Sequence, residues 1–141
     1  MKIAIGSDHR GLDLKEVLIL YLQKNGHQVE DYGAYSSESC DYPKIAIKVG
    51  RAVAKKKVEK GILICGSGLG MTMAASSVKG VRAANCLNLS LARFSREHND
   101  SNVLVFGAMY VDGKLAKRIT GKWLKTSFAG GRHERRVKMF S

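Results

Sequence analysis

The chain has 141 residues, about the length of one domain, and its 45% apolar content and single proline fit a compact soluble fold. No apolar run approaches the roughly 20 residues of a membrane span, and residues 1–6 are interrupted too soon for a signal peptide. We therefore expect a cytoplasmic protein without a membrane partner. The formal net charge of +12 makes nucleic acids and anionic small molecules the partners to consider.

Strands and helices are predicted to alternate along the chain. Short apolar runs predict five strands, at 2–6, 28–31, 61–65, 81–85 and 103–107. Apolar residues at helical spacing predict helices between and after them, at 12–25, 41–53, 71–75, 87–97 and 114–126. This alternation implies right-handed βαβ units. We predict an α/β fold, a Rossmann-like three-layer α/β/α sandwich with a five-stranded parallel sheet.

One domain is expected to span residues 1–141, because no linker, repeat or low-complexity tract divides the chain. In parallel sheets, ligands bind beyond the carboxyl ends of the strands. The turn Ser7-Asp8-His9 follows the first predicted strand, and Cys65 ends the third. These two strand ends should therefore meet at one crevice.

The stretch 61–75, GILICGSGLGMTMAA, is the centre of the predicted site. Its glycine loop, Gly66-Ser67-Gly68-Leu69-Gly70, presents backbone N–H groups at a helix N-terminus, which favours a bound anion. A dinucleotide site does not fit, because the spacing is G-x-G-x-G and no acidic residue follows about twenty positions on. A P-loop would need G-K-[ST], and a cysteine phosphatase would need an arginine where Met71 stands.

Two interpretations of Cys65 remain open from the loop alone. A thiol beside backbone donors can act as a general base and take a proton from carbon next to a carbonyl, while the loop stabilises the enediolate oxygen. Alternatively, Cys65 ends a buried strand and only packs. The three cysteines are far apart and form no CxxC pair, which argues against a zinc site or a redox dithiol. Cys86 is expected to pack, and Cys40 has no expected role.

Three further polar groups each allow a structural and a functional interpretation. His98 is either a surface cap at a helix end or part of the site, and the pair Asp8-His9 is either a helix N-cap or part of the site. Arg132 and Arg136 share a helix face if the tail is helical, and arginine forks suit a phosphate group. Alternatively, the basic tail is solvated or binds RNA.

Five motifs in order resemble the ribose-5-phosphate isomerase B family: GSDHRG at 6–11, DYP at 41–43, GILICGSGLGM at 61–71, REHND at 96–100 and GGRHERRV at 130–137. Together they span nearly the whole chain. Galactose-6-phosphate isomerase subunits look similar but usually lack the GGRH-type tail. The resemblance implies a metal-free and cofactor-free interconversion of D-ribose 5-phosphate and D-ribulose 5-phosphate in the pentose phosphate pathway.

The resemblance also implies roles for individual residues. Cys65 would move the proton between C2 and C1, and the loop Gly66 to Gly70 would hold the enediolate. Ser67 would assist ring opening, and His98 would be the acid or base that opens the furanose ring. The expected substrate-binding residues are Asp8 and Asn99 for sugar hydroxyls, Tyr42 in the wall of the site, and His9, Arg132 and Arg136 for the phosphate.

The resemblance further implies a homodimer or a dimer of dimers. His98 or the arginines would reach a neighbour's site, so that the basic segment 129–141 completes it. Arg10 departs from the small residue common after Asp-His and adds positive charge near the site. One alternative function is isomerisation of a six-carbon sugar phosphate, such as allose 6-phosphate or galactose 6-phosphate. A nucleic-acid-binding module is a remote one, because few aromatic residues stand among the basic ones.

Overall fold

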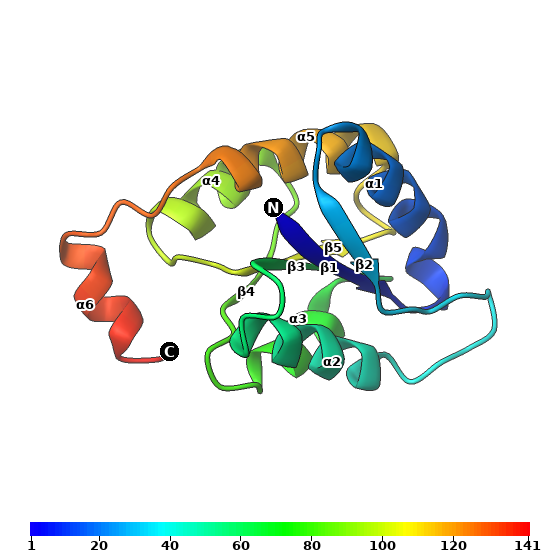
Figure 1. The fold of residues 1–141 in the computed structure, drawn as a ribbon, viewed down its shortest axis with the longest axis horizontal. Coiled ribbons are helices and arrows are strands. Elements are labelled where there is room, and N and C mark those ends of the chain that lie inside the picture. The colour runs from blue at the N-terminus through cyan, green and yellow to red at the C-terminus, as the bar shows by residue number, and fades with distance from the viewer.

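The computed structural model describes all residues 1–141 as a three-layer α/β/α sandwich with one helix set apart (Figure 1). The strands are β1 (Lys2–Ser7), β2 (Gln28–Asp31), β3 (Lys60–Cys65), β4 (Ala83–Asn85) and β5 (Val103–Gly107). The helices are the short 3-10 turn η1 (His9–Gly11), α1 (Leu12–Lys24), α2 (Tyr42–Ala54), α3 (Leu69–Ser76), α4 (Leu89–Glu97), α5 (Gly113–Lys125) and α6 (Arg132–Lys138). All strands pair in parallel in the order β2-β1-β3-β5-β4, which confirms the predicted fold class.

Two hydrophobic cores lie on opposite faces of the sheet. Helices α1, α4 and α5 cover one face, and α2 and α3 cover the other (Figure 1). Side chains alternate along β3, so Ile62 and Ile64 enter the first core while Leu63 and Cys65 enter the second. This period of two directs Cys65, the last residue of β3, toward the layer of α2 and α3.

The ends of β1 and β3 are held side by side. Ser7 pairs with Ile64 in the sheet register, and the Asp8 N–H donates to the Ile64 carbonyl at 3.0 Å. A Cβ on Gly11 would come within 2.6 Å of Ile64 Cγ2, so glycine lets η1 lie directly on β3. The chain leaves β1 toward β2 on one side, and β3 lies on the other, which makes this the switch point of the sheet.

The glycine loop is shorter than predicted, because α3 begins at Leu69 and includes Gly70. Gly68 stands before the helix with φ 84°, a left-handed conformation that favours glycine. Helix α4 begins two residues later than the predicted start at 87, because the Asn88 side chain caps it by accepting from the Leu91 N–H at 2.8 Å. The chain therefore turns into both helices at specific capping positions.

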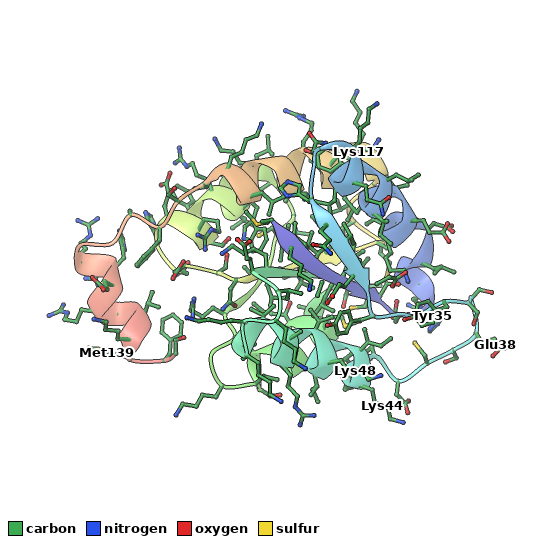
Figure 2. All side chains as sticks on the ribbon, in the orientation of Figure 1. Tyr35, Glu38, Lys44, Lys48, Lys117 and Met139 are labelled. Atoms are coloured by element: carbon green, nitrogen blue, oxygen red, sulfur yellow. The ribbon has the colours of Figure 1, made fainter.

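The C-terminal tail is helical, which was the condition for placing Arg132 and Arg136 on one face. Helix α6 lies beside the sandwich, at the far left of Figure 1, and only Val137 in it is buried. The basic side chains are spread over both helical layers, as Lys48 on α2 and Lys117 on α5 illustrate (Figure 2). No helix is long and apolar enough to span a membrane.

Cys86 packs in the core, as predicted. Its side chain is 1% exposed in the core under α1, α4 and α5. Burial raises the pKa of the Cys86 thiol to about 11, although a contact with Ser95 opposes this. Cys86 therefore stays an unreactive thiol at neutral pH.

Candidate active site

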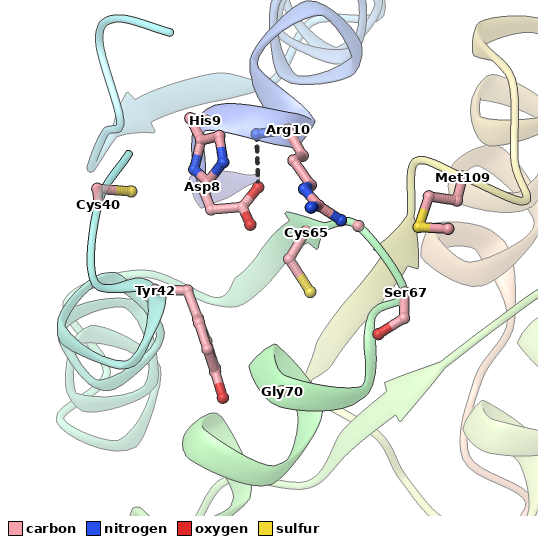
Figure 3. Close-up of a pocket in the computed structure, with 10 residues that line it drawn as sticks. Asp8, His9, Arg10, Cys40, Tyr42, Cys65, Ser67, Gly70 and Met109 are labelled. Carbon is pink, nitrogen blue, oxygen red and sulfur yellow. Dashed lines mark hydrogen bonds between the residues drawn. The ribbon is translucent and has the colours of Figure 1, made fainter. Parts of the chain in front are cut away.

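A cavity of about 360 Å³ lies at the carboxyl ends of β1 and β3 (Figure 3). Its lining residues are Asp8, His9, Arg10, Cys40, Tyr42, Cys65, Gly66, Ser67, Gly70 and Met109. The volume falls within the range of small-ligand sites, about 300–1,000 Å³. The two polar strand ends therefore meet at one cavity, and Cys40, for which no role was expected, lies in its wall.

Cys65 is both a packed residue and a residue of the cavity wall. Its side chain is 6% exposed, and its sulfur accepts a hydrogen bond from the Gly68 N–H at 3.2 Å. The two interpretations of Cys65 are compatible in this geometry, because packing at the end of β3 fixes the thiol beside its donor.

The glycine loop keeps backbone donors free at the cavity. The N–H groups of Gly66, Ser67 and Gly70 donate to no acceptor within the chain. The Leu69 N–H donates to Ser67 Oγ at 3.1 Å, and the Leu69 side chain is exposed. Gly68 and Leu69 do not line the cavity, so Gly68 shapes the loop and holds the sulfur. Free N–H groups beside a thiol can stabilise negative charge that develops on a substrate oxygen.

Asn85, at the end of β4, holds the loop in place and was not predicted. Its Nδ2 donates to the Ser67 carbonyl at 3.2 Å, while its Oδ1 is buried without a partner. On one side, a Cβ on Gly68 would lie 2.6 Å from Asn85 Oδ1, and on the other, a Cβ on Gly107 would lie 2.4 Å from the Ser67 carbonyl oxygen. The loop is therefore clamped between β4 and β5. The available signal was a polar residue at the carboxyl end of a parallel strand.

Asp8 serves as a helix cap and also lines the cavity. Its Oδ1 accepts from the Arg10 N–H at 2.9 Å (Figure 3) and from the Gly11 N–H at 3.0 Å. The structure confirms the cap. The role of Asp8 in binding stays a prediction that this geometry allows, since Oδ2 makes no hydrogen bond within the chain. His9 Nδ1 is buried without a hydrogen-bond partner. Buried polar atoms are normally paired, so this nitrogen marks a place where a polar ligand is expected.

Tyr42 extends into the cavity from the first turn of α2 (Figure 3). A Cβ on Gly70 would lie 2.6 Å from the Tyr42 hydroxyl oxygen and 2.5 Å from its ring. Glycine at position 70 therefore lets the phenol lie directly on the start of α3. This contact closes one side of the cavity.

His98, Asn99, Arg132 and Arg136 do not line this cavity. His98 ends α4, where its N–H donates to the Phe94 carbonyl at 2.9 Å. Its ring stacks on Phe94, with ring centroids 5.0 Å apart, and on His133, with centroids 4.3 Å apart. Arg132 and Arg136 are exposed on α6. Within one chain, the predicted phosphate pair and ring-opening histidine are thus separate from the cysteine.

A partly buried ion-pair network fixes the turn that follows His98. Asp100 has φ 49°, and its carboxylate accepts from Arg96 at 2.9 Å and from Arg82 at 3.3 Å. Arg96 also donates to the Ser101 carbonyl at 2.6 Å. Charge-assisted bonds on both sides of the carboxylate hold His98 and Asn99 in a defined position at the surface.

No group of three His, Cys, Asp or Glu side chains is placed to hold a metal ion. The expectation that the reaction needs no metal or cofactor stays a prediction. The fold and the cavity define an α/β protein with a cavity at the switch point of a parallel sheet, where a thiol lies beside unpaired backbone N–H groups.

Known proteins share this fold and sequence. A model of the Ribose/Galactose Isomerase family matches residues 3–140. Ribose-5-phosphate isomerase B of Escherichia coli (strain K12) is 47% identical over 137 residues, which are 97% of this chain and 92% of that protein. The solved ribose-5-phosphate isomerase B of Clostridium thermocellum is 49% identical with a TM-score of 0.97, covering 99% of this chain and 94% of that one. The corresponding Thermotoga maritima structure is 47% identical with a TM-score of 0.97, covering 99% and 96%. The chain belongs to the ribose/galactose isomerase family, which confirms the predicted resemblance.

Proposed function

We propose that this protein interconverts D-ribose 5-phosphate and D-ribulose 5-phosphate through a cis-enediolate. The observation that carries the proposal is the geometry at the end of β3. The Cys65 sulfur accepts from the Gly68 N–H at 3.2 Å, and the neighbouring N–H groups of Gly66, Ser67 and Gly70 are free. This geometry places a proposed base and a proposed oxyanion-binding loop at one cavity. Two relatives of the chain, from Escherichia coli and Clostridium thermocellum, are named ribose-5-phosphate isomerase B.

The proton transfer follows from these positions. The Cys65 thiolate takes the proton from C2 of the open-chain aldose, and the electron pair forms the C1–C2 double bond while O1 becomes the enediolate oxygen. The free N–H groups of the loop stabilise that oxygen. The Cys65 thiol then returns the proton to C1, and the proton of the C2 hydroxyl passes to O1, which leaves a carbonyl at C2. No net oxidation occurs.

Ring opening and substrate binding use the polar groups around the thiol. The Ser67 hydroxyl and His98 would exchange protons with the ring oxygen and the O1 hydroxyl of the furanose. Asp8, with its free Oδ2, would bind a sugar hydroxyl, as would Asn99, and Tyr42 would enclose the sugar. His9 would contact the phosphate through its imidazole ring, whose Nδ1 has no hydrogen-bond partner within the chain.

We also propose that the protein is a homodimer, or a dimer of dimers, in which each subunit completes the other's site. His98, Asn99, Arg132 and Arg136 would reach the partner's cavity, since they lie outside the cavity of their own chain. Exposed apolar side chains on α3, on and just before α4, and after β5 are candidates for the partner surface: Leu69, Met73, Leu87, Leu91, Phe94, Met109 and Tyr110. The cytoplasmic location stays part of the proposal.

Parallel assays with three substrates test the proposed reaction. We expect the highest kcat/KM with ribose 5-phosphate, and lower values with allose 6-phosphate and galactose 6-phosphate. A higher kcat/KM with either hexose phosphate would transfer the proposal to the six-carbon reaction. Absence of turnover with all three, in a protein that binds inorganic phosphate, would contradict it.

A further inference from the structure

Arg10 lines the cavity, but the proposed mechanism assigns no role to its side chain. It is the only lysine or arginine in the cavity wall, where Asp8 supplies a carboxylate and His9 the only other basic side chain. The proposed substrate carries about two negative charges on its phosphate at neutral pH. A single subunit therefore offers one permanent cation to that substrate, and it is Arg10.

The Arg10 guanidinium is free of protein partners. Only its backbone N–H is engaged, with Asp8 Oδ1, and its side chain takes part in no hydrogen bond or ion pair of the chain. This contrasts with Arg82 and Arg96, whose guanidinium groups both bind Asp100. An arginine beside a ligand cavity with all its donors unpaired is available for an anion.

Packing holds this free guanidinium next to the reactive loop. A Cβ on Gly66 would lie 3.1 Å from Arg10 Cδ, 3.2 Å from its Nη1 and 3.4 Å from Met109 Sδ. The side chain thus lies across the backbone of Gly66, between the Cys65 loop and Met109 (Figure 3). Arg10 also lines a second cavity of about 290 Å³. The acidic residues of that cavity, Asp13 and Asp112, make no ion pair with Arg10.

We propose that Arg10 is a substrate-binding residue whose guanidinium binds an anionic oxygen of the sugar phosphate, on the phosphate or on the enediolate formed from it. The inference rests on the proposed isomerase function. Both oxygens are recognised by the same charge-assisted N–H···O bonds, and arginine can make two of them to one anion. Arg10, which departs from the family pattern, would thereby supply a cation from the same subunit as Cys65. The other arginines proposed for the site, Arg132 and Arg136, lie on α6 and would come from the partner.

The experiment compares Arg10→Met and Arg10→Lys with Arg118→Met, which removes the same charge from the exposed face of α5. Steady-state kinetics with ribose 5-phosphate and binding of inorganic phosphate are measured for each, with the melting temperature as a control for folding. For Arg10→Met we expect kcat/KM to fall by on the order of 10- to 100-fold, a smaller fall for Arg10→Lys, and none for Arg118→Met.

The pattern of the change identifies the oxygen. A higher KM with equally weakened phosphate binding places Arg10 on the phosphate, and a lower kcat with unchanged phosphate binding places it on the enediolate. Values for Arg10→Met equal to those of Arg118→Met, in kinetics and in phosphate binding, would overturn the inference. If the unaltered protein does not turn over ribose 5-phosphate, the proposed function fails, and phosphate binding alone decides whether Arg10 binds an anion. If Arg10→Met does not fold, Arg10→Lys decides by the same criteria.

Discussion

The two regions that carry the predicted site residues are built in different ways. The cavity at the ends of β1 and β3 is lined by well-packed residues, since Cys65 and Asp8 are each 6% exposed. The glycine loop beside it is held between Asn85 and Gly107. Helix α6, in contrast, has only one buried residue, Val137, and displays both of its phosphate-suited arginines to solvent. His98, which stacks on His133 of α6, belongs to this second region.

The difference shows which part of the site one chain can form alone. Packing orients the proposed base, Cys65, and the free N–H groups of the loop within the subunit, so the proposed proton transfer needs no partner for its geometry. The Arg96–Asp100 ion pair fixes the turn at His98, and the His98–His133 stack joins that turn to α6. Neither the turn nor α6 lines the cavity of its own chain. We infer that the two regions meet only across a subunit interface.

The largest effect is expected from removing the proposed base, Cys65, from the cavity. Cys65→Ala should lower kcat by about 10²- to 10⁴-fold, the usual contribution of a general base, while the melting temperature and phosphate binding change little. Cys40→Ser is the matched control, because it removes a thiol from the same cavity wall without a predicted role. Turnover of ribose 5-phosphate measures both. Near-normal turnover of Cys65→Ala would contradict the base role and show that Cys65 only packs.

The next effect concerns the arginines of α6. Arg132→Ala and Arg136→Ala should each raise KM by roughly 10- to 100-fold with a smaller change in kcat, because a charged hydrogen bond to the phosphate is lost. Arg135→Ala removes an exposed arginine from the same helix and should leave KM unchanged. If all three variants have the same KM, the tail is a solvated surface and does not take part in binding.

A smaller effect is expected from loosening the loop clamp. Asn85→Ala removes the donor to the Ser67 carbonyl, which should lower kcat by about 10-fold and leave KM less affected. The split between kcat and KM distinguishes a positioning residue from a substrate contact. A variant that loses thermal stability but keeps kcat would make Asn85 a purely structural residue.

The smallest effect is a pH dependence confined to α6. Partial burial and the positive charges of His98, Arg132 and Arg136 lower the pKa of His133 below its ordinary value of 6.5. The folded form then binds fewer protons than the unfolded form, so the docking of α6 is unaffected above pH 6.5 and weakens as the pH falls below it. Hydrogen exchange should show α6 opening more readily at about pH 5.5 than at about pH 7.5.

His133→Phe provides the control for this effect, since the ring can still stack on His98 without titrating. The variant should open less between the two pH values than the unaltered protein. Equal opening in both would assign the pH dependence to another group.

The sequence was sufficient for the fold and for one half of the site. Alternating strands and helices predicted the parallel sheet, and the rule that ligands bind at strand ends brought Asp8 and Cys65 together. It was not sufficient for Asn85, whose contact with Ser67 depends on β4 lying next to β5 rather than next to β3. Strand order follows from long-range packing, which local patterns do not encode.

The glycine loop shows the same limit at shorter range. Its five residues were predicted as one loop, but Leu69 and Gly70 belong to α3, because Gly68 takes the left-handed conformation before the helix. The place of α6 was likewise not predictable, since a helix with one buried side chain has too little apolar surface to specify where it docks.

Subunit complementation tests the shared site most directly. Two impaired proteins are needed, Cys65→Ala, which lacks the proposed base, and the double variant Arg132→Ala/Arg136→Ala, which has a raised KM. They are mixed under conditions that exchange subunits and assayed at a ribose 5-phosphate concentration far below the KM of the double variant, where neither protein alone gives appreciable turnover. If each cavity is completed by the partner's α6, a mixed dimer contains one cavity with both defects and one intact cavity, so turnover of ribose 5-phosphate should return. If mixed dimers form, as shown by mass spectrometry, and turnover stays at the level of the separate variants, the two regions do not meet across the interface.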